Sequence, residues 1–297
     1  MVNYKQLLAF VTVVDEGGFS AAAKKLFITQ PAVSWQIKSI EKALDVLLIE
    51  RSDRDVLLTQ AGEIFYRNAK IIIDQYKVLE EDIDQFKNNE NGNLRIAAST
   101  IPGEYLLPSL IKKFRSEQPH INTKVYISDS KDVIDKVVSG LVCMGITGIR
   151  PVESELESVA FAEDRLKLVC SVDYSTQKLK DFSTIVKEPI IMREEGSGTR
   201  TVTLAFLKQN GCHVDQLNKN TVFGSTKSSL SAVEAGIGIG WLSEAAISDA
   251  VKLNHVRVLS DTYDIPRQLY IVTYKNRTLS PSAEMFRSFL IKSKTVI

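Results

Sequence analysis

The stretch Ser20-Ala-Ala-Ala-Lys-Lys-Leu26, followed by Thr29-Gln-Pro-Ala-Val-Ser-Trp-Gln-Ile-Lys-Ser-Ile-Glu-Lys-Ala-Leu44, predicts two short helices joined by a tight turn. In the second segment apolar residues recur three or four positions apart, as on one buried helix face; they are Val33, Ile37, Ile40 and Leu44. The other face carries small polar and basic side chains. A short helix, a turn and a second helix of this kind are typical of proteins that enter the major groove of DNA.

Short signals on either side set the boundaries of these helices. An apolar stripe over residues 3–15 predicts a preceding helix, which Gly17-Gly18 ends. Ser20 is expected to cap the second helix and Thr29 the third, because both side chains accept hydrogen bonds from the free N–H groups of a first turn. Pro31 falls in the first turn of the third helix, where its missing N–H costs nothing.

A short hairpin is expected after the third helix. Residues 47–51 and 56–58 predict two strands, and the polar residues 52–55 predict the turn between them. Such a wing would place Arg51 and Arg54 beside DNA phosphates, where they would contribute affinity but no sequence preference.

The charge of this region neither supports nor excludes DNA binding. Residues 1–60 contain seven Lys and Arg against seven Asp and Glu, so their formal charge is zero. A protein that binds polyanions without sequence preference should be strongly basic. Affinity would therefore depend on a focused patch, since residues 20–44 carry four lysines against Glu41, and on doubling by dimerisation.

Three blocks with matching mutual spacing resemble the winged helix-turn-helix of LysR-type transcriptional regulators: Thr29-Gln-Pro-Ala-Val-Ser34, Glu50-Arg-Ser-x-Arg54 and Leu58-Thr59-x-Ala-Gly62. The resemblance implies that the third helix lies at or near the groove. With the cap and wing positions added, the expected DNA-contacting residues are Ser20, Thr29, Gln30, Pro31, Ser34, Trp35, Lys38, Arg51 and Arg54.

The sequence departs from the family pattern at three positions of this motif. Asp53 and Asp55 make the wing more acidic, which lowers the expected contribution of its tip. Trp35 replaces a polar or basic residue, and two roles stay open for it. Its ring would either stack on a sugar of the DNA or pack in a dimer.

A sustained apolar heptad predicts a long helix over residues 60–87, capped by Thr59 and ended by the polar residues 88–93. Its heptad residues are Phe65, Ala69, Ile72, Tyr76, Leu79, Ile83 and Phe86. The helix would be roughly 40 Å long, and two paired copies would hold two reading heads ~34 Å apart, one DNA turn. The alternative is a helix packed on its own domain, but no nearby core is evident for it. We therefore expect a dimerisation helix.

Strands and helices alternate from residue 94 onward, which predicts an α/β fold with a parallel sheet. The expected strands are residues 94–99, 123–128, 144–149, 166–171, 189–193, 221–225, 237–242 and 268–275. The expected helices are residues 106–117, 133–139, 199–210, 229–235 and 283–292.

Two such units with a cleft between them resemble the periplasmic-binding-protein-like (type 2) effector domain of LysR-type regulators. The resemblance implies crossovers near residues 162–166 and 264–268, with the last strand and helix returning to the first lobe. The expected division is a winged helix-turn-helix domain at 1–59, a linker and dimerisation helix at 60–91 and an effector-binding domain at 92–297, whose lobes are 92–163 with 267–297, and 164–266.

Ligands in open α/β sheets bind beyond the strand ends, where helix N-termini offer free N–H groups. Four strand ends of this chain carry hydroxyl side chains, and the Arg193–Arg200 segment adds two guanidinium groups suited to carboxylate, sulfate or phosphate. That segment also looks like the loop of the LysR-type subset that regulates carbon fixation and sulfur assimilation, which suggests a small anionic metabolite. The expected effector-binding residues are Ser99, Thr100, Ile101, Thr147, Gly148, Arg193, Gly196, Ser197, Thr199, Arg200, Ser225 and Thr226.

Nothing in the sequence predicts catalysis or a cofactor. Residues 195–199 lack the first glycine of a nucleophile elbow, and residues 236–240 lead into a strand instead of opening a helix as a dinucleotide fingerprint does. The three histidines and three cysteines show no metal-ligand spacing. We expect no metal site, and plain thiols in a reducing cytoplasm. No apolar run is long enough to predict a membrane span.

The sequence thus predicts a cytoplasmic DNA-binding transcription regulator that binds double-stranded promoter DNA as a homodimer or homotetramer and responds to a small anionic effector. A ligand-independent or redox-tuned regulator is one alternative. The other is a small-molecule binding protein or enzyme whose N-terminal helices serve only assembly, which would leave the exposed face of residues 30–42 without a purpose.

Overall fold

The computed structural model describes residues 2–51, 56–88, 92–175, 181–212, 217, 221–293 and 295–296. The chain divides into two compact units, Met1–Glu90 and Asn91–Ile297. In the described part of the chain no helix is long and apolar enough to cross a membrane.

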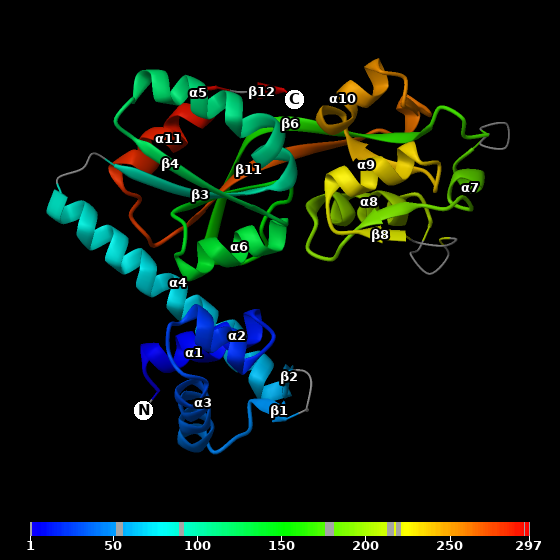
Figure 1. Ribbon diagram of the computed structural model, residues 1–297. Coiled ribbons are helices and arrows are strands. Elements are labelled where there is room, and N and C mark those ends of the chain that lie inside the picture. Colours follow the sequence, from blue (N-terminus) through cyan, green and yellow to red (C-terminus); the bar gives the residue numbers. More distant parts are fainter. Residues whose placement is uncertain are drawn as a thin grey trace. The chain divides into compact units, whose positions relative to one another are not determined.

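The first unit is a helix-turn-helix with a short hairpin and one long helix (Figure 1). Its elements are α1 (Tyr4–Asp15), α2 (Phe19–Lys25), α3 (Gln30–Leu44), β1 (Ile49–Arg51), β2 (Val56–Leu58) and α4 (Gln60–Asn88). The predicted apolar face of α3 is confirmed at Val33, Ile37 and Ile40, which are buried in a core shared with α1. Leu44 is exposed, contrary to prediction, because α3 runs past this core and the chain turns away at Asp45 with a positive φ.

Helix caps agree with prediction at Thr29 and Thr59, whose hydroxyl oxygens accept hydrogen bonds from the first turns of α3 and α4. The predicted cap at Ser20 is wrong. Helix α2 begins at Phe19 with Gly18 at the cap position, and Ser20 lies exposed in the first turn. Phe19 packs against the hydrophobic core, which draws it into the helix.

The second unit consists of two lobes joined by two long strands (Figure 1). Its strands are β3 (Asn93–Ser99), β4 (Asn122–Ser128), β5 (Met144–Thr147), β6 (Leu156–Ser171), β7 (Ile191–Arg193), β8 (Thr221–Phe223), β9 (Gly240–Ser243), β10 (Val256–Val258), β11 (Ile265–Tyr274) and β12 (Thr295–Val296). Its helices are η1 (Pro102–Leu106), α5 (Leu107–Glu117), α6 (Ser130–Ser139), α7 (Phe182–Ile185), α8 (Gly198–Gln209), α9 (Thr226–Glu234), α10 (Glu244–Lys252), η3 (Asp261–Tyr263) and α11 (Pro281–Lys292).

The main sheet is mixed, and not parallel as the alternation of elements predicted. Strand β3 pairs in parallel with β4 and β5, whereas β11 runs antiparallel to both β5 and β6. Strands β6 and β11 cross between the lobes side by side, in a register that opposes Leu166 to Ile265 and Leu156 to Tyr274. Two strands that carry the chain out of a lobe and back again must run in opposite directions, so the sheet between the lobes is antiparallel.

Each lobe has helices on both sides of its strands. In the first lobe, α5 and α11 pack on one face of the sheet around Phe114 and Phe286, and α6 packs on the other face through Val133 and Val137. In the second lobe, α8 packs near Trp241, and α9 and α10 form a separate cluster. Helices α7 and α10 were not predicted from the sequence. These cores fix the strand ends at which the lobes face each other.

Candidate functional sites

The outer face of α3 carries the side chains that were predicted to meet DNA. Gln30, Pro31, Trp35 and Lys38 are exposed, and Ser34 is half-buried. Positions three and four apart lie on the same helix face, so these residues form one continuous surface. Ser20 and Thr29, at the starts of α2 and α3, are exposed as well.

Trp35 is 64% exposed, so it is not part of the core of its own unit. Its large apolar surface remains free for a partner. The two roles predicted for it, stacking on DNA and packing in a dimer, both need this exposure.

The hairpin after α3 is held by hydrogen bonds from α3 and by close packing against α4. Glu41 on α3 accepts from the backbone N–H groups of Leu48 (2.9 Å) and Ile49 (3.3 Å). Gly62 on α4 passes so close that an added Cβ would lie 2.0 Å from the carbonyl oxygen of Leu48. Glycine is therefore required there by space. Arg51 lies in β1, but its side chain falls outside the described residues.

Part of the expected wing lies in the turn after β1. Arg54, Asp53 and Asp55 fall outside the described residues.

Helix α4 has two different halves. Phe65 packs edge-on against Phe10 at a ring-centroid distance of 5.0 Å, and Ala69 is buried in the same core. The expectation that this helix lacks a core of its own is therefore wrong for its first half. Farther along, four heptad residues are exposed, namely Ile72, Tyr76, Leu79 and Ile83. The side chain of Phe86 lies outside the described residues.

A small cavity of about 10 Å³ lies where the two lobes face each other. Six of the predicted effector-binding residues line it: Ser99, Thr100, Ile101, Arg193, Ser197 and Thr199. It also contains residues that were not predicted. Asp129 and Ser130 start α6, and Arg267 comes from β11. A polar space of this size holds about one water molecule.

The hydroxyl of Ser130 finds no hydrogen-bond partner within the described part of the chain, although the residue is 1% exposed. Unsatisfied buried hydroxyls are costly and uncommon in folded proteins. Asp129 beside it is satisfied, because its Oδ1 accepts from the N–H of Asp132 at 2.9 Å and caps α6. Strand β4 ends at Ser128, just before these two residues. The position after a predicted strand end could therefore have identified them from the sequence.

Both arginines of the cavity are held by carboxylates. Arg193 donates from Nε and Nη2 to Glu194 at 2.7 and 2.6 Å, and from Nη1 to Thr226 at 2.5 Å. Arg267 donates from Nε and Nη2 to Asp164 at 2.8 and 2.6 Å, and from Nη1 to Thr199 at 3.2 Å.

The remaining predicted effector residues lie around the cavity without lining it. Arg200 donates to the carbonyl of Arg193 at 3.0 Å, and Thr147 is buried and donates to the carbonyl of Ile149 at 2.7 Å. Ser225 caps α9. These side chains therefore have partners within the protein, and so does Thr226, which accepts from Arg193.

The lobes touch directly beside the cavity. The N–H of Lys131 donates to the carbonyl of Gly196 at 3.2 Å. Gly196 has φ +89°, and an added Cβ would lie 2.8 Å from Oδ1 of Asp129. A side chain at Gly196 would therefore both strain the backbone and separate the lobes.

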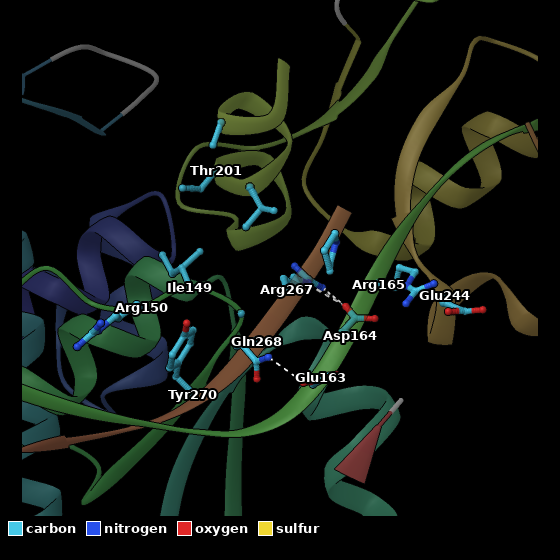
Figure 2. A pocket seen from close by; sticks show the side chains of 14 residues that line it. Ile149, Arg150, Glu163, Asp164, Arg165, Thr201, Glu244, Arg267, Gln268 and Tyr270 are labelled. Atoms are coloured by element: carbon cyan, nitrogen blue, oxygen red, sulfur yellow. Dashed lines mark hydrogen bonds and ion pairs between the residues drawn. The ribbon is translucent and has the colours of Figure 1, made fainter. Parts of the chain in front are cut away.

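A larger groove of about 710 Å³ lies on the connecting strands, with Arg267 also in its wall (Figure 2). Charged groups of both signs line it, including Arg150, Arg165, Glu163 and Glu244, and Gly148 belongs to its lining. Figure 2 shows the Arg267–Asp164 pair between these groups. Small-molecule sites commonly measure roughly 300–1,000 Å³, so the groove has room for a metabolite.

The described residues contain no cluster of side chains that could hold a metal ion. Burial raises the pKa of the Cys143 thiol to about 11, and it also raises the pKa values of Cys170 and Cys212. Thiols that react with oxidants are accessible and have lowered pKa values. The cysteines therefore do not support a redox-tuned regulator.

The chain matches known families along nearly its whole length. Residues 4–63 match the bacterial regulatory helix-turn-helix protein, lysR family, and residues 87–294 match the LysR substrate binding domain. A probable RuBisCO transcriptional regulator of Cyanidioschyzon merolae is 33% identical over 291 residues, with 95% of each chain covered.

Two solved structures share the fold. Full-length CbnR, crystallised in complex with its target DNA, aligns with a TM-score of 0.71 at 19% identity and covers 98% of this chain and 99% of its own. The regulatory domain of CcmR from Synechocystis PCC6803, solved in complex with 2-PG, aligns with a TM-score of 0.62 at 22% identity over 69% of this chain and 98% of its own.

A helix-turn-helix with an exposed reading helix, joined to a two-lobed α/β domain, defines a DNA-binding transcription regulator and not an enzyme. This chain belongs to the LysR family of transcriptional regulators, as its sequence motifs predicted. It is a DNA-binding transcriptional regulator with an effector-binding domain.

Proposed function

We propose that this regulator reads operator DNA with the α3 helices of two paired protomers, and that a small anionic metabolite bound between the lobes adjusts its activity. The observation that carries the effector part is the orphaned hydroxyl of Ser130, which belongs to the lining of a narrow cavity beside two buried arginines. A ligand larger than water needs the lobes to separate, so its binding would change the lobe equilibrium. A regulator of promoter DNA acts where the DNA is, which we propose to be the cytoplasm.

Replacing Gln30 with alanine is expected to relax sequence selectivity. Its exposed amide lies in the first turn of α3, where side chains reach base edges in the major groove. Loss of one good base contact costs roughly 1–3 kcal/mol of discrimination, about 5- to 150-fold. Competition gel shifts with operator and random DNA at fixed salt would measure this ratio. Lys5→Ala, at an exposed position of α1, is the control. An unchanged ratio for Gln30→Ala would remove Gln30 from the reading surface.

Several features support an anionic effector between the lobes. The cavity is surrounded by hydroxyl groups and by the N-termini of α6 and α8, which favour negative charge. Two arginines supply planar donor groups. CcmR, a fold relative, was solved with 2-PG in its regulatory domain. The metabolite itself is best found by a thermal-shift screen of the full chain, because a ligand at 100 times its dissociation constant adds about 2.7 kcal/mol of stability.

Replacing Thr100 with valine is expected to raise the half-maximal effector concentration ~10-fold or more, because a hydrogen bond to a charged group contributes roughly 1.5–3 kcal/mol. Basal DNA binding should not change, since Thr100 is in the second unit and lines the cavity. DNA-binding titrations with and without the effector found in the screen would test both statements. Thr123→Val on β4, outside the cavity, is the control. An equal effect of the two variants would place the effector elsewhere.

A further inference from the structure

Glu194 holds the donor groups of Arg193 that an anion would need. Its two carboxylate oxygens accept from Nε and Nη2 at 2.7 and 2.6 Å, the paired geometry in which arginine also binds carboxylate or phosphate ligands. The third donor, Nη1, is fixed by Thr226 at 2.5 Å. Arg193 thus already has a bound carboxylate, supplied by the next residue of the chain.

The positive charges around the cavity are already balanced in this state. Arg193, Arg200 and Arg267 contribute three positive charges, and Asp129, Glu194 and Asp164 contribute three negative charges, so the sum is zero. An entering oxyanion would meet no net positive charge, and its repulsion from the nearby carboxylates is stronger in a buried site than in water.

Asp164 and Glu194 differ in how easily each can move away from its arginine. Asp164 is fully buried and accepts from Ser243 at 2.8 Å as well as from Arg267, so it is fixed on both sides. The Glu194 side chain is 26% exposed, whereas that of Arg193 is 5% exposed. A rotation of Glu194 toward solvent would free the guanidinium while Thr226 keeps it in place.

We propose that Glu194 is an internal ligand of Arg193, and that an anionic effector binds by displacing it. This inference rests on the proposed function, since it takes the cavity between the lobes as the effector site. Once Glu194 leaves, the remaining charges sum to +1, and the paired Nε and Nη2 donors of Arg193, a residue that lines the cavity, become available. The site then selects a ligand that offers two oxygens of one carboxylate, phosphate or sulfate group. A neutral hydroxylated ligand cannot replace the carboxylate.

Competition between Glu194 and an anion for Arg193 lowers the apparent affinity for the anion. The apparent dissociation constant equals the intrinsic constant divided by the fraction of protein in which the internal carboxylate has left the site. Removing the negative charge at position 194 should therefore tighten anion binding, instead of weakening it as loss of an ordinary site residue would.

The test uses the full chain with inorganic phosphate and sulfate as probes, titrated by calorimetry at constant ionic strength. Glu194→Gln keeps the shape of the side chain and should bind phosphate ~10-fold more tightly than the unmodified chain. Glu194→Ala should also bind phosphate more tightly. This second variant keeps the test valid if Glu194→Gln does not fold. Glu195→Gln removes the same charge from the neighbouring exposed position and should change the dissociation constant by less than twofold. Combining Arg193→Gln with Glu194→Gln should abolish the gain.

The outcomes separate the inference from the proposed function. Binding that depends on Arg193 but is equally strong in the Glu194 and Glu195 variants would overturn the inference and leave the anion site in place. Absence of Arg193-dependent binding in every variant would overturn both. Melting temperatures and operator binding of each variant confirm that the titrations report folded protein.

Discussion

Replacing Leu79 with glutamate is expected to lower operator affinity at least ~100-fold by separating the two protomers. Leu79 is 56% exposed on α4, within a row of exposed heptad residues that includes Ile72, Tyr76 and Ile83. Burying a leucine contributes roughly 1.5–3 kcal/mol, and a symmetric pair of helices buries two copies, so the loss is about 3–6 kcal/mol. Placing two carboxylates in the same seam adds repulsion.

The physical reason for so large an effect on DNA binding is the charge of the reading head. The first sixty residues carry no formal net charge, so one head has little nonspecific attraction to DNA. Two linked heads bind the second half-site at a high effective concentration, which raises overall affinity without new contacts. Loss of pairing should therefore reduce affinity far more than loss of any one base contact.

Sedimentation of the variant and gel shifts on the DNA upstream of its own gene, at fixed salt, would measure both effects. Lys77→Glu introduces the same residue two positions away, outside the heptad, where Lys77 is exposed. It should leave assembly intact. A Leu79→Glu protein that still sediments as an oligomer and binds normally would show that α4 does not pair the protomers. The same sedimentation runs on the unmodified chain decide between dimer and tetramer.

Local periodicity predicted the first unit well because its fold depends on contacts close in sequence. The spacing of Val33, Ile37 and Ile40 defines the buried face of α3 without reference to any other element. The errors at Ser20 and Leu44 arose where a contact from outside the helix decided the boundary. Phe19 is the first residue of α2 because its ring packs against the core. Leu44 is exposed because it lies beyond the residues against which it could pack.

The heptad of α4 shows why one periodic pattern can serve two surfaces. Phe65 and Ala69 are spaced as a dimer seam would be, yet they pack on the core of their own unit. The same stripe continues through Leu79 and Ile83, where that core has ended and the side chains are exposed. Spacing reports which face is apolar, but it does not report what covers that face.

The rule that ligands bind beyond strand ends predicted the hydroxyl groups of the cavity. It could not predict the ion pair beside them. Ser99, Thr100 and Ser197 lie at junctions that the sequence makes visible. Arg267 and Asp164 lie within strands, 103 residues apart, and meet only because β6 and β11 pair in one particular register. Such a contact depends on topology, which the alternation of elements did not determine. The direction of these two strands was also the main error in the predicted sheet.

That ion pair has a second consequence, for stability. Replacing Asp164 with asparagine is expected to destabilise the second unit by about 3–5 kcal/mol, because it leaves the guanidinium of Arg267 buried without a counter-charge. The two side chains are 0% and 4% exposed, so water cannot take the place of the lost carboxylate. Thermal or urea unfolding of the full chain, followed through the transition of the second unit, would measure the loss.

Glu163→Gln is the matched control, since Glu163 is the neighbouring residue on β6, is exposed and has an amide partner in Gln268 at 3.0 Å. It should change stability by no more than about 0.5 kcal/mol. Replacing both partners, Asp164→Leu with Arg267→Met, should recover most of the stability because no charge remains buried. A double variant as unstable as Asp164→Asn would mean that the pair holds the lobes through geometry that apolar side chains cannot supply. The Arg267 bond to Thr199 would then be the contact to examine.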